Sequence, residues 1–247
     1  MTSPQYESGL IEARRDFAAR DGVRLFFMGE GAAESFSRFL INFHALSVQI
    51  VLPTERWISE SARCCASLGF DTLQRTFSGM VPGGKRRLRR LLRDVRALAS
   101  HSGGVEGCVA PRKEVIASLW SPGVVDFLDA CDDAATGPHP FSLMAIQHEI
   151  AQVHLVYSKT MIDSARAALR SRTEECLSYL QDYLTEGSEE ASALADALAL
   201  FLADNPEAAV PMAARASSAL SAYGRFIDDC SDVATLPFVW RLSTPER

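Results

Sequence analysis

The feature that most constrains the fold is a helical hydrophobic period that runs from residue 141 to residue 230. Apolar side chains recur there every three or four positions, and strand-like alternation is almost absent. The clearest stripe is Leu143, Ile146, Ile150, Val153, Tyr157 and Met161, and a second is Leu194, Ala195, Leu198, Phe201 and Leu202. Because a period near 3.6 residues places such positions on one helix face, the sequence predicts an all-α fold, a compact multi-helix bundle.

The composition predicts a single soluble domain. The chain has 247 residues, 47% of them hydrophobic, which is enough to fill a substantial core. We expect one helical domain over residues 1–247, with an N-terminal extension at residues 1–30 and a long loop at residues 99–113. The absence of a membrane-spanning apolar run and of a secretory signal pattern predicts a cytoplasmic protein. A homodimer is the default expectation for a soluble helical protein of this size.

Helix boundaries are predicted from glycine, proline and capping residues. The expected helices cover residues 32–53, 54–68, 85–98, 124–135, 142–184, 189–203 and 211–229. Gly69 is expected to stop the second helix, and Pro82-Gly83-Gly84 to form a turn before the third. Gly187-Ser188 and Asn205-Pro206 are expected to separate the last three helices.

Several functional classes are disfavoured by the sequence. Six cysteines occur without a Cys-x-x-Cys pair, which favours free thiols over disulfides or a zinc site. The net charge of −6 disfavours nucleic-acid binding, because neutralising phosphates needs a basic surface. The chain contains no nucleophile elbow, phosphate-binding glycine loop or dinucleotide fingerprint, which argues against hydrolases, kinases and Rossmann dehydrogenases.

The helix predicted to begin at residue 142 carries the best candidates for a site. Its projection places His154 and Gln147 on the apolar face and Glu149 at the margin of that face. His44 lies beside the apolar face of the helix predicted at 32–53 and can reach the same interior. An inward histidine serves as a general base, a metal ligand or a hydrogen-bonded core residue, and the sequence leaves these roles open.

Two acidic groups have a spacing compatible with cation binding. The first falls at i, i+4 and i+7 of a predicted helix, where carboxylates can converge: Asp182, Glu186 and Glu189. The second is a cluster of four aspartates: Asp126, Asp129, Asp132 and Asp133. This cluster resembles the aspartate-rich magnesium motifs of helical isoprenoid synthases. A solvated acidic helix face is the alternative interpretation of both groups.

Residues 85–96 carry seven basic side chains, six of them arginine. Apolar residues between them form a stripe, so this helix is expected to pack on one side and to be strongly positive on the other. Bidentate arginine contacts suit an acidic protein, a carrier domain or an anionic substrate. The residues expected to bind such a partner are Arg86, Arg89, Arg90 and Arg93. The alternative is a solvated face whose arginine stems cover the core.

The order of segments over residues 32–230 resembles the haem-oxygenase-like superfamily. The likeness is carried by the predicted turn before Arg89-Arg90-Leu91-Leu92-Arg93-Asp94-Val95-Arg96-Ala97-Leu98 and by the His139-Pro140 connector into a long helix that bears Glu149. This superfamily includes haem oxygenases, thiaminase-type and PQQ-synthase-type proteins, and the non-haem di-iron oxidases of natural-product pathways. The resemblance implies a haem-oxygenase-like bundle.

The resemblance also implies candidate ligands. Glu149 stands where the mid-chain glutamate ligand of the di-iron members is expected, and His44 is the candidate for the axial histidine of haem. The early glutamate-histidine pair of the di-iron members has no counterpart at residues 55–95. The closest match to their late ligand helix is the acidic group Asp182, Glu186 and Glu189.

From this resemblance we expect an oxidative enzyme that acts on a small organic molecule in a biosynthetic pathway. His44 and His154 would be metal ligands or acid–base groups, and Glu149 a ligand or proton acceptor. Gln147 and Tyr157 would orient the substrate. Iron is the candidate cofactor, and a metal-free enzyme fits the residues as well. The alternative is a non-catalytic member of the fold that serves as a binding or partner protein through its arginine-rich helix.

Overall fold

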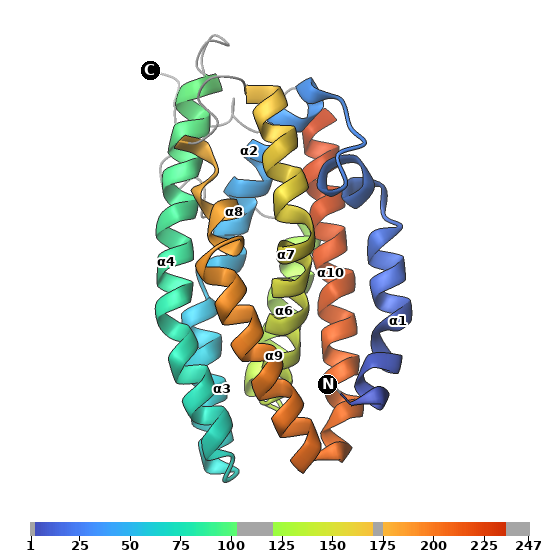
Figure 1. Ribbon diagram of the computed structural model, residues 1–247, viewed down its shortest axis with the longest axis vertical. Coiled ribbons are helices and arrows are strands. Elements are labelled where there is room, and N and C mark those ends of the chain that lie inside the picture. Colours follow the sequence, from blue (N-terminus) through green and yellow to red (C-terminus); the bar gives the residue numbers. More distant parts are fainter. Residues whose placement is uncertain (1–2, 103–120, 170–174, 236–247) are drawn as a thin grey trace.

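The protein is a bundle of α-helices (Figure 1). A computed structural model describes residues 3–102, 121–169 and 175–235, and no strand occurs among them. The elements are α1 (Pro4–Ala18), η1 (Val23–Phe27), α2 (Ala33–Val51), α3 (Thr54–Ser67), α4 (Asp71–Ser102), α6 (Pro122–Thr136), α7 (Ser142–Leu169), α8 (Ser178–Tyr183), α9 (Glu186–Asp204), η3 (Pro206–Ala208) and α10 (Ala209–Thr235). The all-α prediction is therefore confirmed for the described residues.

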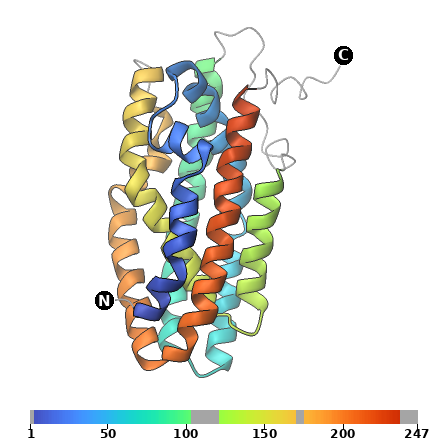
Figure 2. The ribbon, with the colours of Figure 1, turned by 90° about the vertical axis from the view of Figure 1, so that its right-hand side faces the viewer.

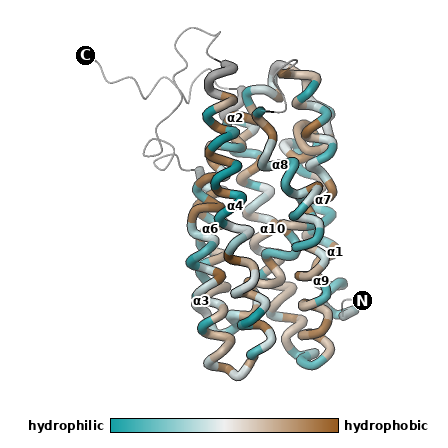
Figure 3. The backbone as a smooth tube through the Cα atoms, turned by 60° about the vertical axis from the view of Figure 1, so that its left-hand side comes forward, coloured by the Kyte–Doolittle hydropathy of each residue, from teal (hydrophilic) through white to brown (hydrophobic). Residues whose placement is uncertain are grey.

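The long helices lie side by side along the long axis of the molecule (Figure 1, Figure 2). Helix α10 packs against α1, α2, α6 and α7, and α2 packs in addition against α4. Helix α3 lies against α4 and α6, and α9 lies against α7 and α4. In the shared core, the Phe43 ring contacts the rings of Phe27, Phe39 and Phe226. Figure 3 shows hydrophilic and hydrophobic residues interleaved along the helices, as amphipathic packing requires.

Local signals account for several helix ends. Gly69, with φ of 82°, adopts the left-handed conformation that commonly ends a helix, and α3 stops just before it, as predicted. At the start of α6, the Ser121 hydroxyl accepts a hydrogen bond from Val124 N at 3.3 Å, and Pro122 occupies the first turn. The predicted bounds of α2, α3 and α6 agree with the structure to within two residues.

Residues 3–30, part of the segment expected as an N-terminal extension, pack on the bundle. Helix α1 packs on α10 and buries Tyr6, Leu10 and Phe17, and η1 buries three further apolar side chains. The three buried residues of α1 share one helix face. Polar residues between them hide this stripe in the average composition of the segment.

Helix α4 continues through Pro82, Gly83 and Gly84, so the turn predicted there is wrong. A Cβ on Gly83 would lie 2.7 Å from Glu190 Oε1 of α9, and one on Gly84 would lie 3.7 Å from Thr54 Cγ2 of α3. Gly83 therefore serves the close packing of α4 on α9, whereas Gly84 has room for a Cβ. Helix α4 ends at Ser102, so residues 99–102 of the predicted loop are helical. Residues 103–113 of that loop lie outside the described residues.

The segment predicted as one helix over residues 142–184 contains two described helices, α7 and α8. Residues 170–174 lie outside the described residues. The break predicted at Gly187-Ser188 lies instead before Glu186, where α9 begins. Gly187 is needed for packing, because a Cβ at this position would lie 3.0 Å from the Asp182 carbonyl oxygen. The predicted break at Asn205-Pro206 is confirmed, since α9 ends at Asp204.

Two properties predicted from composition can be compared with the structure. One stretch, Ser35–Ser67, is apolar and long enough to cross a membrane by length and composition alone. It comprises α2 and α3, and 72% of its most apolar window is buried in the bundle, as in the core helices of a folded domain.

The described cysteines are free thiols, as predicted: Cys64, Cys65, Cys131, Cys176 and Cys230. Cys108 lies outside the described residues.

Candidate functional site

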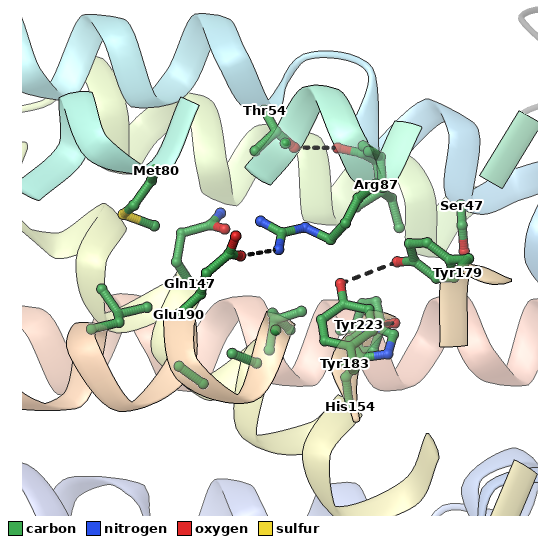
Figure 4. Close-up of a pocket in the computed structure, with 18 of the residues that line it drawn as sticks. Ser47, Thr54, Met80, Arg87, Gln147, His154, Tyr179, Tyr183, Glu190 and Tyr223 are labelled. Atoms are coloured by element: carbon green, nitrogen blue, oxygen red, sulfur yellow. Dashed lines mark hydrogen bonds and ion pairs between the residues drawn. The ribbon is translucent and has the colours of Figure 1, made fainter. Parts of the chain in front are cut away.

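A cavity of about 80 Å³ lies between the inner faces of the helices (Figure 4). Its apolar walls include Trp57, Phe127 and Leu194. Its polar lining comes from helices α2, α3, α4, α7, α8, α9 and α10: Ser47, Thr54, Arg87, Gln147, His154, Tyr179, Tyr183, Glu190 and Tyr223. Polar groups in a protein interior are costly unless they are hydrogen-bonded, so this concentration marks the cavity as the candidate site.

His154 of α7 is the central polar residue of the pocket. Its Nε2 lies 3.0 Å from the Tyr223 hydroxyl of α10, and its ring stacks on Tyr183 with centroids 4.0 Å apart. Burial, followed by the electrostatic influence of Arg87 and His44, lowers the pKa of His154 to about 3. The imidazole is therefore neutral at physiological pH and acts as a hydrogen-bonding group.

Two tyrosines of α8 form one wall of the pocket. The hydroxyls of Tyr179 and Tyr183 lie 3.3 Å apart and share a hydrogen bond (Figure 4). Only one of their two hydroxyl hydrogens is used in that bond, so the other remains for a further acceptor. Burial raises the pKa of both tyrosines above the ordinary value, so both stay protonated at neutral pH.

Arg87 of α4 brings a positive charge into the pocket. Its Nη1 pairs with Glu190 Oε2 at 2.5 Å, and its guanidinium carbon lies 5.8 Å from the centroid of the Tyr183 ring. Figure 4 shows the guanidinium pointing toward Glu190 and Gln147. Burial disfavours the charge, but the interactions with Tyr183 and Glu190 raise the pKa of Arg87, which therefore stays charged.

Two buried polar atoms of the pocket lack a hydrogen-bond partner among the described residues. They are Ser47 Oγ and His154 Nδ1. Leaving such an atom unpaired in a core costs about 1–3 kcal/mol, and native proteins usually supply a partner from the protein or from ordered water. The pocket is thus equipped to form hydrogen bonds with a molecule that enters it.

His44 is buried but does not line the pocket. Its Nδ1 donates to the Leu40 carbonyl oxygen at 2.9 Å, while its Nε2 lies 3.9 Å from Asp94 Oδ2 without a hydrogen bond. Asp94 in turn accepts hydrogen bonds from the start of α8. The Tyr179 ring lies edge-on to both histidines, 5.9 Å from His44 and 5.8 Å from His154. The two histidines thus contact the same tyrosine.

Glu149 faces α1 and not the pocket. Arg14 of α1 binds its carboxylate through Nε and Nη2, both at 2.8 Å. The Tyr6 hydroxyl at 3.2 Å and His148 Nδ1 at 3.1 Å complete its contacts. Burial alone would raise the pKa of Glu149, but the hydrogen bonds from Arg14 and His148 lower it to about 2. The carboxylate anchors the N-terminal helix.

The two residues expected to orient a substrate lie in different surroundings. Gln147 lines the cavity near Glu190 (Figure 4). Tyr157 is half-buried among aromatic side chains, with its ring 5.7 Å from Phe27 and 6.4 Å from Phe17, and does not line the cavity. Of the site residues predicted on α7, the structure therefore brings together Gln147 and His154.

Asp182, Glu186 and Glu189 do not converge on a cation site. Asp182 lies on α8 and pairs with Arg86 at 2.9 Å and with Arg90 at 2.6 Å. Glu186 begins α9 and pairs with the same two arginines, each at 3.0 Å. Glu189 is exposed and pairs with no described residue. The acidic and basic runs of the sequence thus largely neutralise each other.

The basic face expected to bind a partner is divided by these ion pairs. Arg86 and Arg90 are held internally, whereas Arg89 and Arg93 are exposed. The nearest carboxylate to Arg93 is Asp94, at 4.0 Å, and its side chain is 66% exposed. A docking surface on α4 would therefore be built on Arg89 and Arg93.

The four aspartates compared with magnesium motifs serve mainly to hold helices together. Three of them pair with arginines of α10 and α3: Asp126 with Arg225, Asp132 with Arg56, and Asp133 with Arg215. Asp129 is exposed. Asp132 also accepts a hydrogen bond from the indole of Trp57, which lines the pocket.

The donor groups do not fit the iron or haem implied by the resemblance. Among the residues that the structure describes, no group of three or more His, Cys, Asp or Glu side chains is placed to hold a metal ion. Glu149 is bound by Arg14 and does not line the cavity that His154 lines. The cavity of about 80 Å³ is also smaller than the ~150 Å³ that admits benzene, which leaves no room for a porphyrin.

Sequence reasoning missed seven polar residues of the pocket: Ser47, Thr54, Arg87, Tyr179, Tyr183, Glu190 and Tyr223. Arg87 lies in the basic run of residues 85–96, which the sequence predicts to form an exposed helix face. Its position four residues before the buried Leu91 is the signal that could have identified it as the inward arginine of that run. The spacing of Tyr179 and Tyr183, four residues apart, likewise indicates one helix face.

Comparisons of this chain with protein-family models, with curated proteins and with solved structures found no match. Its function is therefore inferred from the side chains of the pocket.

Proposed function

We propose that the protein binds a small organic molecule in the interior pocket, as a metal-free member of the haem-oxygenase-like class. The observation that carries this proposal is the pair of buried, unpartnered atoms in one cavity, Ser47 Oγ and His154 Nδ1. Each needs a hydrogen-bond partner, and both belong to residues that line a space able to hold one. The pocket also has the apolar walls and few convergent polar groups typical of small-molecule sites.

The oxidative activity expected from the resemblance would then proceed without a metal. The bound molecule would lose two electrons and two protons to oxygen, which would leave as hydrogen peroxide. His154, neutral and hydrogen-bonded to Tyr223, would orient this molecule and would not be the strong base of the reaction. Oxygen uptake, measured with an electrode in the presence of a molecule that binds, separates an oxidase from a binding protein.

Ala151 of α7 lines the pocket and provides the test of binding. Ala151→Met fills the cavity while keeping a good helix former. Ala167→Met, at an exposed position of the same helix, is the matched control. We expect a library of fragment-sized molecules, screened by saturation-transfer NMR, to yield binders of the natural protein and of the control that do not bind Ala151→Met. Binders shared by all three proteins, or no binders at all, would contradict the proposal.

The second candidate function is the binding of a partner protein through the arginine-rich helix α4. It is supported by the exposed side chains of Arg89 and Arg93. This role is independent of the pocket. Arg89→Glu together with Arg93→Glu would abolish the capture of an acidic carrier domain and leave fragment binding unchanged.

A further inference from the structure

We propose that the ligand of this pocket is a small organic carboxylate held by Arg87. The inference rests on the proposed function, because it names the chemical class of the molecule bound at the same site. It follows from the hydrogen-bonding capacity of the lining, from the ion-pair network behind Arg87 and from the size of the cavity.

The pocket offers several hydrogen-bond donors that have no partner among the described residues. Ser47 has an unused hydroxyl, and Tyr179 and Tyr183 together have one hydroxyl hydrogen in excess of their mutual bond. Arg87 uses Nη1 for Glu190, and its Nε and Nη2 make no hydrogen bond to the described residues. A guanidinium carries five N–H donors, so several remain available. A lining rich in donors is complementary to a ligand rich in acceptors.

The carboxylate of Glu190 does not depend on Arg87 alone. Its Oε1 pairs with Arg86 Nη2 at 2.6 Å, while its Oε2 pairs with Arg87. Arg87 can therefore turn part of its guanidinium toward a ligand without leaving the half-buried carboxylate of Glu190 unpaired. A carboxylate uses the fork of N–H groups on an arginine in two parallel hydrogen bonds, which a neutral amide cannot reproduce.

The size of the cavity limits the ligand to a few heavy atoms. At about 80 Å³ it has roughly half the volume of the ~150 Å³ cavity that admits benzene. Carboxylic acids of two to about four carbons are in this range. The rings of Tyr183 and Tyr223 and the side chain of Leu194 supply an apolar surface for the short carbon chain.

The test compares acids with neutral molecules of the same shape. Acetate, propionate and butyrate, and the matching amides, are titrated into the full chain at neutral pH and constant ionic strength, with chemical shifts recorded by NMR. We expect the acids to bind at least tenfold more tightly than the amides. Arg87→Met should remove this preference, whereas Arg89→Met, at an exposed position of the same helix, should keep it.

The outcomes separate this inference from the proposed function. Equal or tighter binding of the amides overturns the carboxylate inference and leaves small-molecule binding intact. If no acid or amide binds, and if Ala151→Met also leaves fragment binding unchanged, both proposals fail. The comparison of acids with amides on the natural chain needs no variant, so it decides the question even if Arg87→Met does not fold.

Discussion

The ion pair between Glu149 and Arg14 gives the most quantitative test of the structure. Glu149 is 3% exposed, and its carboxylate is bound by two nitrogens of Arg14, by the Tyr6 hydroxyl and by His148. Glu149→Gln removes the negative charge but preserves the size of the side chain. Arg14 remains 38% exposed in the natural protein, so its guanidinium can be hydrated after the change.

The expected loss follows from the pKa of Glu149. The value in the folded protein is about 2, compared with an ordinary value of 4.5. Since one pKa unit corresponds to about 1.4 kcal/mol, the charged form contributes about 3 kcal/mol to folding at neutral pH. The folded pKa is the lower one, so this contribution is complete above the unfolded pKa of 4.5 and is lost as the pH falls through about 2.

Urea unfolding followed by circular dichroism measures this contribution. At about pH 7, Glu149→Gln should unfold with a free energy about 3 kcal/mol smaller than that of the natural chain. At about pH 3 the difference should shrink to roughly half, because Glu149 is then protonated in the unfolded chain but still mostly ionised in the folded protein, so that unfolding takes up a proton. Glu12→Gln, at an exposed position of α1, is the control and should change stability by less than about 0.5 kcal/mol.

Two results would refute this reasoning. A difference at neutral pH below about 1 kcal/mol would mean that the four contacts do not stabilise the charge. A difference that stays constant as the pH falls would mean that Glu149 has an ordinary pKa, and the cost of the substitution would then come from packing.

Three further predictions concern helix packing and the buried charges, and urea unfolding checks each one. Gly123→Ala should lower the free energy of unfolding by about 3 kcal/mol, because the new Cβ would lie 2.2 Å from Phe226 N. Gly79→Ala is the control and should be neutral or stabilising, because nothing lies within 4 Å of its new Cβ. Equal effects of the two substitutions would contradict the close packing of α6 on α10. Asp94→Asn should lower the free energy of unfolding by about 2 kcal/mol, since an amide cannot accept both hydrogen bonds that Asp94 receives from Ser178 Oγ and Tyr179 N. A variant as stable as the natural chain would exclude that pair of hydrogen bonds. Arg86→Met should lower the free energy of unfolding by about 2 kcal/mol, because the buried carboxylate of Asp182 would lose one of its ion pairs. Arg93→Met should lower it by less than about 0.5 kcal/mol, because Arg93 is exposed. A larger effect at Arg93 than at Arg86 would reverse the assignment of inner and outer arginines.

The sequence was sufficient to predict the helices whose apolar stripe is strong. Helices α2, α3 and α6 were located to within two residues, since caps and stop signals flank them. Glycine was misread at Gly83 and Gly187, where it permits close packing. A one-dimensional pattern cannot distinguish a glycine that bends the chain from one that admits a neighbouring helix.

The candidate site was predicted only in part for a related reason. Helical projection placed His154 and Gln147 inward, and both line the pocket. It placed Glu149 at the margin, but could not show that the marginal position would be covered by α1 and paired with Arg14. Partners distant in the sequence, such as Arg87 with Glu190, arise from the arrangement of the helices in space, which periodicity does not determine.

The pairing of α1 with α10 has a consequence for the biosynthesis of this protein. Helix α1 leaves the ribosome before α10, but most of the surface on which Tyr6, Leu10 and Phe17 pack belongs to α10. At translation rates of ~5–20 residues per second, the interval before α10 is made is on the order of 10 to 40 s. During that interval the apolar face of α1 is open to chaperones and to other nascent chains. Helix α1 therefore reaches its final packing only after α10 has been synthesised.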